Sequence, residues 1–247
     1  MSRNFDLFQQ IDRERQQPSP CQEVTLLAPV ARQSQIRLPG EVRTEITRLV
    51  QRVFLLSNGF APRVILFTAI EAASKSSRVC AYSADLLAAH ITGSVCLVDA
   101  NLTSPSLHEA FGRGNTSGLT DLVNDSQAVR DIAIPVSESN LWLLSSGPPV
   151  AGVEEMIGSE TMRFRMAELR SEFDYVLINA PPAGAYSQVA SLAALTDGVI
   201  LVLQAHSTRR DVARQVKEEL ESAGARVLGA VLNDRSFPIP QIIYSRL

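Results

Sequence analysis

From residue 41 onward, short apolar runs alternate along the chain with segments whose apolar residues recur at helical spacing. The apolar runs lie at 63–68, 95–98, 141–146, 175–179, 198–204 and 226–233. The last three are almost uninterrupted, which is typical of strands covered on both faces in a parallel sheet. Helical patterns separate the runs, at 41–56, 77–90, 159–171, 187–196 and 208–223. This alternation predicts an α/β fold with a doubly wound, mostly parallel sheet flanked by helices.

The first forty residues follow a different pattern. Phe5, Phe8 and Ile11 fall on one side of a short helical segment, and either docking of this segment or full solvation is compatible with the pattern. The stretch from Gln16 to Gly40 carries four prolines and no sustained periodicity, which is typical of a linker. We therefore predict a flexible N-terminal tail and linker at 1–40, followed by one domain at 41–247.

Composition narrows the class of protein. Hydrophobic residues make up 45% of the chain and the net charge is -3, which argues against disorder and against a dedicated nucleic-acid binder. The three cysteines form no CxxC pair, and Cys80 and Cys96 lie in apolar runs, so buried free thiols are expected. No apolar run approaches the roughly 20 residues that span a bilayer, and the N-terminus lacks the plan of a signal peptide. We expect a cytoplasmic protein that reaches a membrane only through a partner.

The loop after the first strand is a candidate phosphate site, because ligands of doubly wound folds sit at the carboxyl ends of strands. A P-loop needs glycines to aim several backbone N–H groups at one anion, then a lysine and a Ser or Thr. The literal match here is Ser74-Lys75-Ser76, with Ala69 and Ser74 where glycines belong. An ordinary strand–loop–helix is the alternative interpretation.

Two further strand ends carry polar residues. Asp99 ends the second strand, where its carboxylate suits a metal-bound water or a metal ion, although a helix or turn cap is the alternative role. Asn179 ends the strand at 175–179. If this strand carried a Walker B group, an aspartate would stand at position 179. An amide offers a carbonyl oxygen but no charge, so it supports Mg²⁺ less well than a carboxylate does.

Taken together, these stretches resemble the cytoplasmic bacterial tyrosine autokinases of capsule and exopolysaccharide assembly, P-loop proteins related to the MinD and ParA ATPases. "DANLTSPSLHEAFG" at 99–112 resembles the family's D-A-D-L-R-x-P-S-L-H-x-x-F-G, and "FDYVLINAPP" at 173–182 resembles F-D-x-V-I-I-D-T-P-P. "GLTDLV", "LTDGVILVLQAHSTRRDVARQV" and "VLGAVLN" match later family segments in order. The resemblance covers the chain from about Glu41 to its end and implies ATP and Mg²⁺ as cofactors.

The resemblance also implies a second register for the first loop. Counting from Thr68, the family's glycine positions fall on Ala73 and Lys75, its phosphate lysine on Ser76, and its Mg²⁺-binding Ser/Thr on Ser77. Both registers stay open at this stage. The residues expected to line a nucleotide site are Ala73, Ser74, Lys75, Ser76, Ser77 and Asn233, with Asp99 as the catalytic carboxylate and with Ser77 and Asp99 as metal ligands. Asn101, Thr103 and Asn179 replace acidic or basic residues of the family pattern.

Three other features follow from the resemblance. Asn233 matches the family residue that faces adenine, although a strand-terminal turn residue is the simpler interpretation. The segment 45–52 resembles the helix through which the family forms oligomers and keeps its Glu45 and Arg48, with Gln51 in place of the last arginine. A plain amphipathic helix with exposed charges is the alternative. Tyr244 is the candidate phosphoacceptor, or else packs against the domain. The implied partner is a membrane-embedded polysaccharide copolymerase or chain-length regulator.

Three functions remain open on the sequence. The first is a regulatory or weakly active pseudoenzyme of exopolysaccharide assembly, because most of the charged residues of the nucleotide site are replaced. The second is an active ATP-dependent tyrosine autokinase with a reshaped loop. The third is a MinD/ParA-like positioning ATPase, which would be expected to carry a glycine-rich loop and a membrane-targeting tail.

Overall fold

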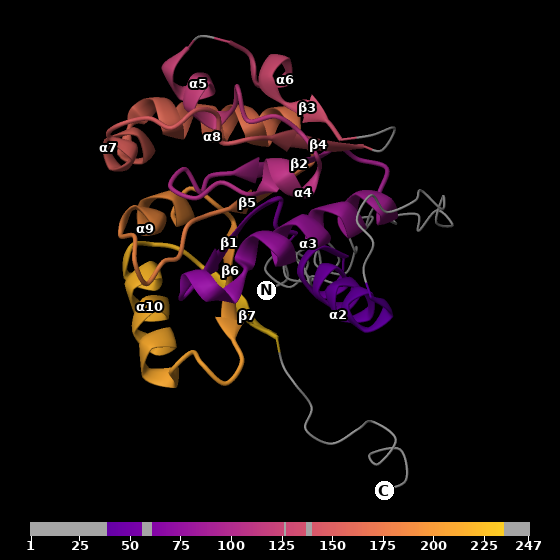
Figure 1. Ribbon diagram of the computed structural model, residues 1–247, viewed down its shortest axis with the longest axis vertical. Helices are drawn as coiled ribbons and strands as arrows, with labels where there is room; N and C mark the ends of the chain where they lie inside the picture. The colour runs from indigo at the N-terminus through magenta and orange to yellow at the C-terminus, as the bar shows by residue number, and fades with distance from the viewer. Residues whose placement is uncertain (1–38, 56–60, 126, 137–139, 235–247) are drawn as a thin grey trace, which may run out of the picture. The chain divides into compact units, whose positions relative to one another are not determined.

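A sheet of seven strands forms the centre of the fold (Figure 1), in the order β3-β4-β2-β5-β1-β6-β7. The computed structural model describes residues 39–55, 61–125, 127–136 and 140–234. The strands are β1 Val64–Ala69, β2 Val95–Asp99, β3 Ile134–Pro135, β4 Leu141–Leu144, β5 Tyr175–Asn179, β6 Gly198–Gln204 and β7 Val227–Asn233. All pairings between them are parallel except that of β3 with β4. The interior strand β1 lies between β5 and β6, so its carboxyl end lies beside the carboxyl ends of both.

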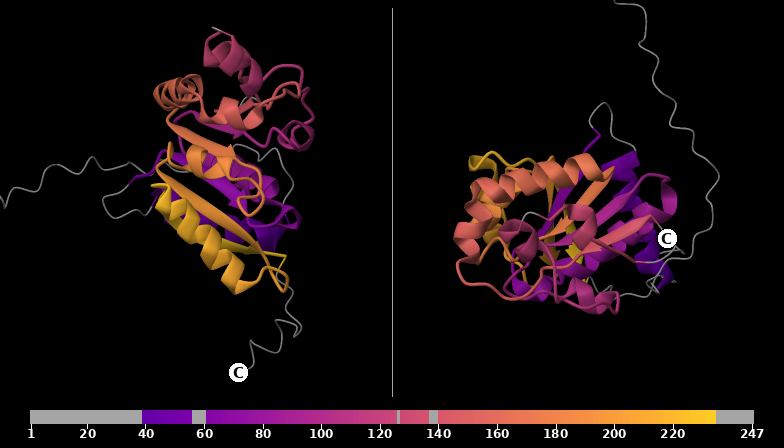
Figure 2. Two further views of the ribbon diagram at one scale, coloured as in Figure 1. Left: turned by 90° about the vertical axis from the view of Figure 1, so that its left-hand side faces the viewer. Right: turned by 90° about the horizontal axis from the view of Figure 1, so that it is seen from above.

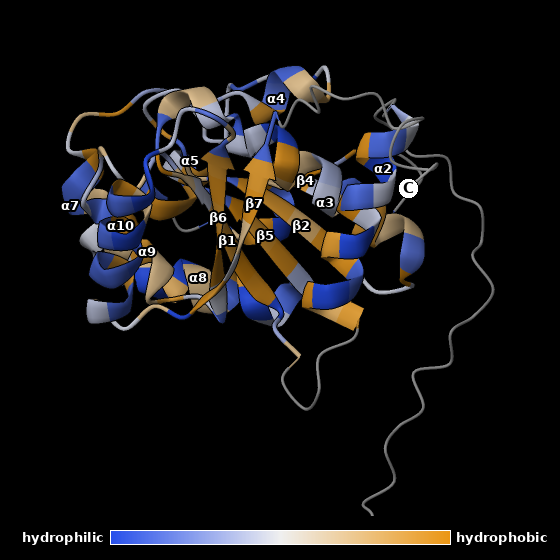
Figure 3. Cartoon of the chain, turned by 90° about the horizontal axis from the view of Figure 1, so that it is seen from below, coloured by the Kyte–Doolittle hydropathy of each residue, from blue (hydrophilic) through white to orange (hydrophobic). Residues whose placement is uncertain are grey.

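Helices cover both faces of this sheet (Figure 2), because the apolar side chains of each strand alternate between two cores. One face is covered by α2 Gly40–Val50, its π-helical extension Gln51–Leu55, α3 Ser76–His90 and α4 Leu107–Ala110. The other is covered by α5 Leu119–Asn124, α6 Val129–Ile132, α7 Val153–Gly158, α8 Glu160–Glu172, α9 Gln188–Ala193 and α10 Arg210–Ser222. Figure 3 shows the result as hydrophobic strands enclosed by helices with hydrophilic outer surfaces.

The predicted fold class is confirmed, and the long elements lie within a few residues of their predicted positions. The exceptions are concentrated between 107 and 158, where α4 to α7 and β3 were not predicted. These elements are two to six residues long, too short to display a period. The predicted strand 141–146 is shorter in the structure, and the predicted helix 41–56 ends in a π-helical turn.

The two cysteines at 80 and 96 are free thiols, buried as predicted. Burial raises the pKa of both thiols, which makes them unreactive packing residues. Cys21, residues 1–38 of the predicted tail at 1–40 and the phosphoacceptor candidate Tyr244 lie outside the described residues. The predicted domain boundary stays a prediction. Within the part of the chain that the structure describes, no helix has the length and apolar character needed to cross a bilayer.

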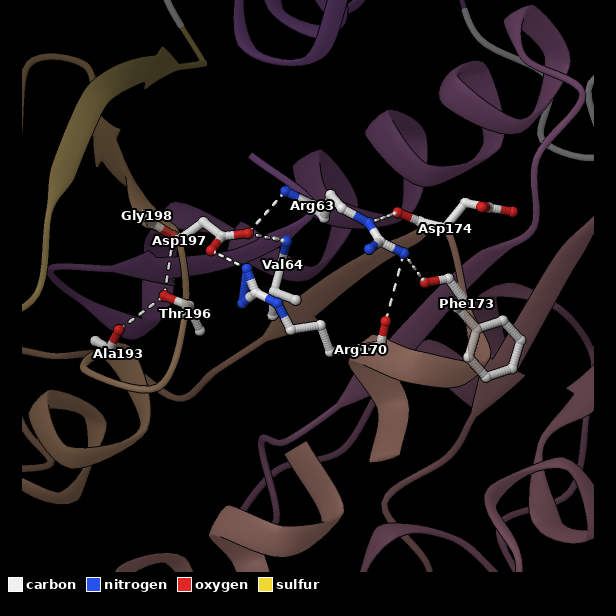
Figure 4. Close-up of polar contacts among 9 residues, drawn as sticks. All are labelled: Arg63, Val64, Arg170, Phe173, Asp174, Ala193, Thr196, Asp197 and Gly198. Carbon is white, nitrogen blue, oxygen red and sulfur yellow. Dashed lines mark hydrogen bonds and ion pairs between the residues drawn. The ribbon is translucent and has the colours of Figure 1, made fainter. Parts of the chain in front are cut away.

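A polar cluster fixes the amino-terminal end of β1 (Figure 4). Asp197 Oδ2 accepts from the backbone N–H groups of Arg63 and Val64, at 2.8 and 2.9 Å, while its Oδ1 pairs with Arg170. The Arg63 side chain donates to carbonyl groups at the end of α8 and beyond it, including that of Phe173 at 2.9 Å. This cluster connects β1, α8 and the start of β6 at the amino-terminal ends of the strands, whereas the candidate site lies at their carboxyl ends.

Candidate functional site

The loop that follows β1 turns into α3 without a single glycine. Ala72–Ser74 form one 3-10 turn, Lys75 adopts left-handed backbone angles of φ 52° and ψ 44°, and α3 begins at Ser76. A non-glycine residue in this conformation is strained by about 1–2 kcal/mol. The strain falls on Lys75, whereas Ala73 is absent from the residues with positive φ. Only one of the two glycine positions of the family pattern therefore adopts a backbone that favours glycine.

Three serines surround this turn and lie in different environments. Ser74 is fully buried, and its Oγ has no hydrogen-bond partner among the described residues. Ser76, the first residue of α3, is 9% exposed, and its Oγ donates to Oδ1 of Asn179 at 3.5 Å. Ser77 is half-buried one residue further along the helix. The structure therefore brings Ser76, which the second register aligns with the family lysine, against Asn179.

Asp99 and Asn179 lie directly opposite each other on the paired strands β2 and β5. Both are fully buried, and Asn179 Nδ2 donates to Asp99 Oδ1 at 2.9 Å. The other donors to the Asp99 carboxylate are backbone N–H groups, those of Asn101 at 3.3 Å, Ser106 at 3.0 Å and Leu107 at 2.9 Å. Burial raises the pKa of Asp99, although these hydrogen bonds favour its charged form.

This geometry bears on the predicted metal site. The two oxygens of Asp99 accept four hydrogen bonds from the protein, so they are occupied in stabilising the turn and α4 that follow β2. Asn101, which stands where the family has a second aspartate, uses its Oδ1 to accept from Thr103 Oγ1 and Ser104 N. Mg²⁺ prefers charged oxygen ligands in octahedral geometry. The described residues contain no group of three acidic, His or Cys side chains that could hold a metal ion.

The end of β7 contacts the loop from the other side. Asn233 Nδ2 donates to the carbonyl of Ser74 at 3.1 Å, and Lys75 Nζ pairs with Asp234 Oδ2 at 3.1 Å. Gln204, at the end of β6, donates to the same Asp234 oxygen at 3.2 Å. Sequence reasoning singled out Asn233 but missed Asp234 and Gln204, because neither belongs to a recognisable phosphate-binding motif.

The chain after β5 closes the site from a third direction. Thr68 Oγ1 donates to the carbonyl of Pro181 at 2.6 Å, and the N–H of Ala183 donates to the carbonyl of Ala69 at 2.8 Å. A Cβ added at Gly184 would lie 2.6 Å from the carbonyl oxygen of Ile70, which is closer than real contacts allow. The backbone at the end of β1 therefore packs directly against the loop that follows Asn179.

No protein-family model matches the chain. The tyrosine-protein kinase YwqD of Bacillus subtilis (strain 168) is 30% identical over 141 residues, 57% of this chain and 60% of that protein. The putative tyrosine-protein kinase CapB of Staphylococcus aureus is 28% identical over 137 residues, 56% of this chain and 60% of that protein. The chain is related to the bacterial tyrosine kinases. The matches span about 60% of the length of these kinases.

Solved structures agree with this relationship to the tyrosine kinases. The kinase domain of VpsO superposes with a TM-score of 0.73 at 26% identity, over 79% of this chain and 96% of that domain. A plasmid partition protein of Borrelia burgdorferi superposes with a TM-score of 0.55 at 15% identity, over 75% of this chain and 87% of that protein, a likeness in fold alone. The fold is that of the P-loop proteins of the tyrosine kinase and MinD/ParA type.

The helix that resembles the kinases' oligomer-forming segment is also described. Glu45 and Arg48 on α2 form an ion pair at 2.6 Å, with more than half of each side chain exposed. An exposed pair of this kind within one helix contributes little to stability. Its charges are therefore available at the surface, and the role of the segment in oligomer formation stays a prediction.

Proposed function

We propose that this chain acts in exopolysaccharide or capsule assembly as a regulatory or weakly active relative of the tyrosine kinases, with a degraded ATP and Mg²⁺ site. The observation that carries this proposal is the hydrogen-bonded series Ser76–Asn179–Asp99. In the register implied by the resemblance, a lysine and an aspartate would occupy the first two positions. Here a hydroxyl and an amide take their places and bond to each other, so Ser76, Asn179 and Asp99 are hydrogen-bonded in series without a cation.

The chemistry of phosphoryl transfer explains why these replacements matter. Catalysis depends almost entirely on positioning the phosphates and on neutralising the charge that develops on them. Ser76 and Asn179 supply no charge, and Asp99 already accepts four hydrogen bonds from the protein. Lys75 is the nearest remaining cation of the loop, but its ammonium group pairs with Asp234. The loss affects catalysis more than simple occupancy by a nucleotide, because the α3 N-terminus still offers backbone N–H groups to an anion.

The left-handed residue supports the register on which this proposal depends. In that register Lys75 stands at a glycine position, and glycine is the residue that adopts this backbone without strain. The next residue, Ser76, then begins α3 at the position of the family lysine. In the literal register Lys75 itself would be the phosphate lysine. The one residue of the loop with positive φ would then not stand at a glycine position of the family pattern.

The proposed setting is the inner face of the bacterial membrane. By resemblance to the capsule and exopolysaccharide kinases, the partner is a membrane-embedded polysaccharide copolymerase or chain-length regulator, which would hold this cytoplasmic chain at the membrane. The exposed charges of Glu45 and Arg48 on α2 support the further proposal of a homo-oligomer formed through residues 41–56.

Two measurements test the proposal. Titration with Mg-ATP and with a fluorescent analogue should give no micromolar, magnesium-dependent binding, and incubation with labelled ATP should give little phosphotyrosine. The variant Ala73→Gly/Lys75→Gly/Ser76→Lys/Asn179→Asp restores the family residues and should bind nucleotide more tightly than the natural chain. Label on Tyr244 of the natural chain that Asp99→Ala abolishes would show an active kinase and overturn the proposal. No gain in the restored variant would overturn the register.

A further inference from the structure

Two side chains from the end of β7 hold the glycine-free loop. Asn233 donates to the carbonyl of Ser74, and Asp234 pairs with Lys75, so two successive residues of β7 and its exit contact two successive residues of the loop. These partners are 159 residues apart in the sequence. The contacts therefore join the P-loop to the point where the chain leaves the sheet.

The backbone at both ends of the ion pair is unusual. Lys75 has a φ of 52° and Asp234 a φ of 51°, and both lie in the left-handed region that disfavours residues with a Cβ. Such conformations persist where surrounding contacts hold them. Asp234 is held by Gln204 as well as by Lys75, and the pKa of its carboxyl is lowered by the hydrogen bonds from Gln204 and Lys75. Each strained residue is therefore supported by contacts that include the other.

We propose that Lys75 and Asp234 form a latch that couples the conformation of the P-loop to the exit of β7. Lys75 is then a positioning residue whose ammonium group keeps the loop closed against Asp234. An anion that attracts the Lys75 ammonium group away from Asp234 would release the loop. The latch does not depend on whether the pocket binds nucleotide, because both partners belong to the chain itself.

The exposure of the pair determines how strong the latch can be. The Lys75 and Asp234 side chains are 49% and 43% exposed, so solvent and salt screen their attraction. The coupling energies that double-mutant cycles give for exposed ion pairs correspond to changes of roughly 1.5- to 5-fold in an equilibrium constant. A contact of this size can be broken by a modest competing interaction, whereas the neutral contact of Asn233 with Ser74 should be insensitive to salt. Salt dependence therefore distinguishes the latch from the rest of the interface.

Hydrogen exchange of the full chain, without nucleotide, tests this inference. In the natural chain, the peptide covering 69–78 should exchange about two- to fivefold faster at about 500 mM salt than at about 50 mM salt. Asp234→Asn should exchange faster than the natural chain at about 50 mM salt and should lose the salt response, whereas Asn233→Ala should exchange faster while keeping the salt response. By reciprocity, Lys75→Met should accelerate exchange in 228–234. Methionine is preferred to glycine here because it leaves the backbone strain unchanged.

Two controls complete the experiment. Asp211→Asn removes another exposed carboxylate, which pairs with Arg209, and should leave exchange in 69–78 unchanged. The swap Lys75→Asp/Asp234→Lys should recover the salt response that either single variant loses. Exchange in 69–78 that is the same in Asp234→Asn as in the natural chain, or that does not respond to salt, would overturn the latch. Neither result would decide the proposed loss of Mg-ATP chemistry, which is tested by ligand binding and labelling.

Discussion

The side-chain amide of Asn179 donates to the carboxylate of Asp99 at 2.9 Å, between two buried residues that face each other on adjacent strands. The pair can be stable because only one of its members is charged. The amide also accepts from Ser76 through Oδ1, so it bonds to both neighbours. The neutral amide of Asn179 therefore bridges Ser76 and the carboxylate of Asp99.

This relationship predicts that Asn179→Asp alone destabilises the fold. The substitution places a second carboxylate against Asp99 in a buried position and replaces the donated hydrogen bond by repulsion. Leaving such a charge uncompensated costs about 3–5 kcal/mol, and the penalty should shrink at lower pH as one carboxyl takes up a proton. The free energy of unfolding from urea denaturation measures the effect.

A double-mutant cycle tests whether the side chains at positions 76 and 179 are energetically coupled. Ser76→Lys should offset part of the loss when it is combined with Asn179→Asp, because the ammonium group would face the added carboxylate. Asn124→Asp, at an exposed position at the end of α5, is the matched control and should change stability little. Additivity of the two changes at 76 and 179 would show that these side chains are independent.

The raised pKa of Asp99 predicts a pH dependence of defined sign. Burial raises this pKa above its usual 3.8, so the native chain binds the proton more tightly than the unfolded chain does. The free energy of unfolding should therefore fall as the pH rises from 3.8 through the higher native pKa, relative to Asp99→Asn. Urea denaturation at a series of pH values gives this difference.

Asp211 provides a control with the opposite sign. Its hydrogen bond with Arg209 lowers its pKa below 3.8, so its contribution is present above that value and is lost as the pH falls further. Relative to Asp211→Asn, the natural chain should therefore lose stability on the acid side of 3.8. A flat difference between the natural chain and Asp99→Asn would contradict the assigned effect of burial on Asp99.

Much of the fold could be predicted from the sequence because of where apolar residues concentrate. Almost unbroken apolar runs predict the strands β5, β6 and β7. In contrast, α4 and α6 have four residues each, and their positions depend on tertiary contacts such as the capping of α4 by Asp99. A turn of this length carries no periodicity that a sequence could reveal.

In the site, too, the features set by local sequence could be predicted, and those set by contacts between distant residues could not. The positions of Asp99 and Asn179 follow from strand ends, which the sequence marks clearly. The contact of Lys75 with Asp234 joins residues 159 positions apart, and no local pattern connects them. The left-handed backbone of Lys75 could not be predicted either, because lysine is not a residue that indicates positive φ.

The close approach at Gly184 predicts a steric effect next to the P-loop. A methyl group there would meet the carbonyl oxygen of Ile70 at 2.6 Å, so Gly184→Ala must displace the backbone at the end of β1. Overpacking of this kind costs about 1–3 kcal/mol. Gly229→Ala on β7 is the matched control, since nothing lies within 4 Å of the added atom. Thermal unfolding of both variants would show a lower melting temperature for Gly184→Ala, and equal values would contradict the packing seen here.

The cluster around Asp197 predicts a loss of stability at the opposite edge of the sheet. Asp197→Ala removes the acceptor for the N–H groups of Arg63 and Val64 and leaves Arg170 without its partner. Hydrogen bonds to a charged group contribute about 1.5–3 kcal/mol each. We therefore expect the free energy of unfolding, measured by urea denaturation, to fall by at least the contribution of one such bond. Asp197→Asn keeps one acceptor oxygen and should fall between the alanine variant and the natural chain. Because the cluster lies at the amino end of β1, exchange in 69–78 should keep its salt response in both variants, and its loss would mean that the two sheet edges are coupled.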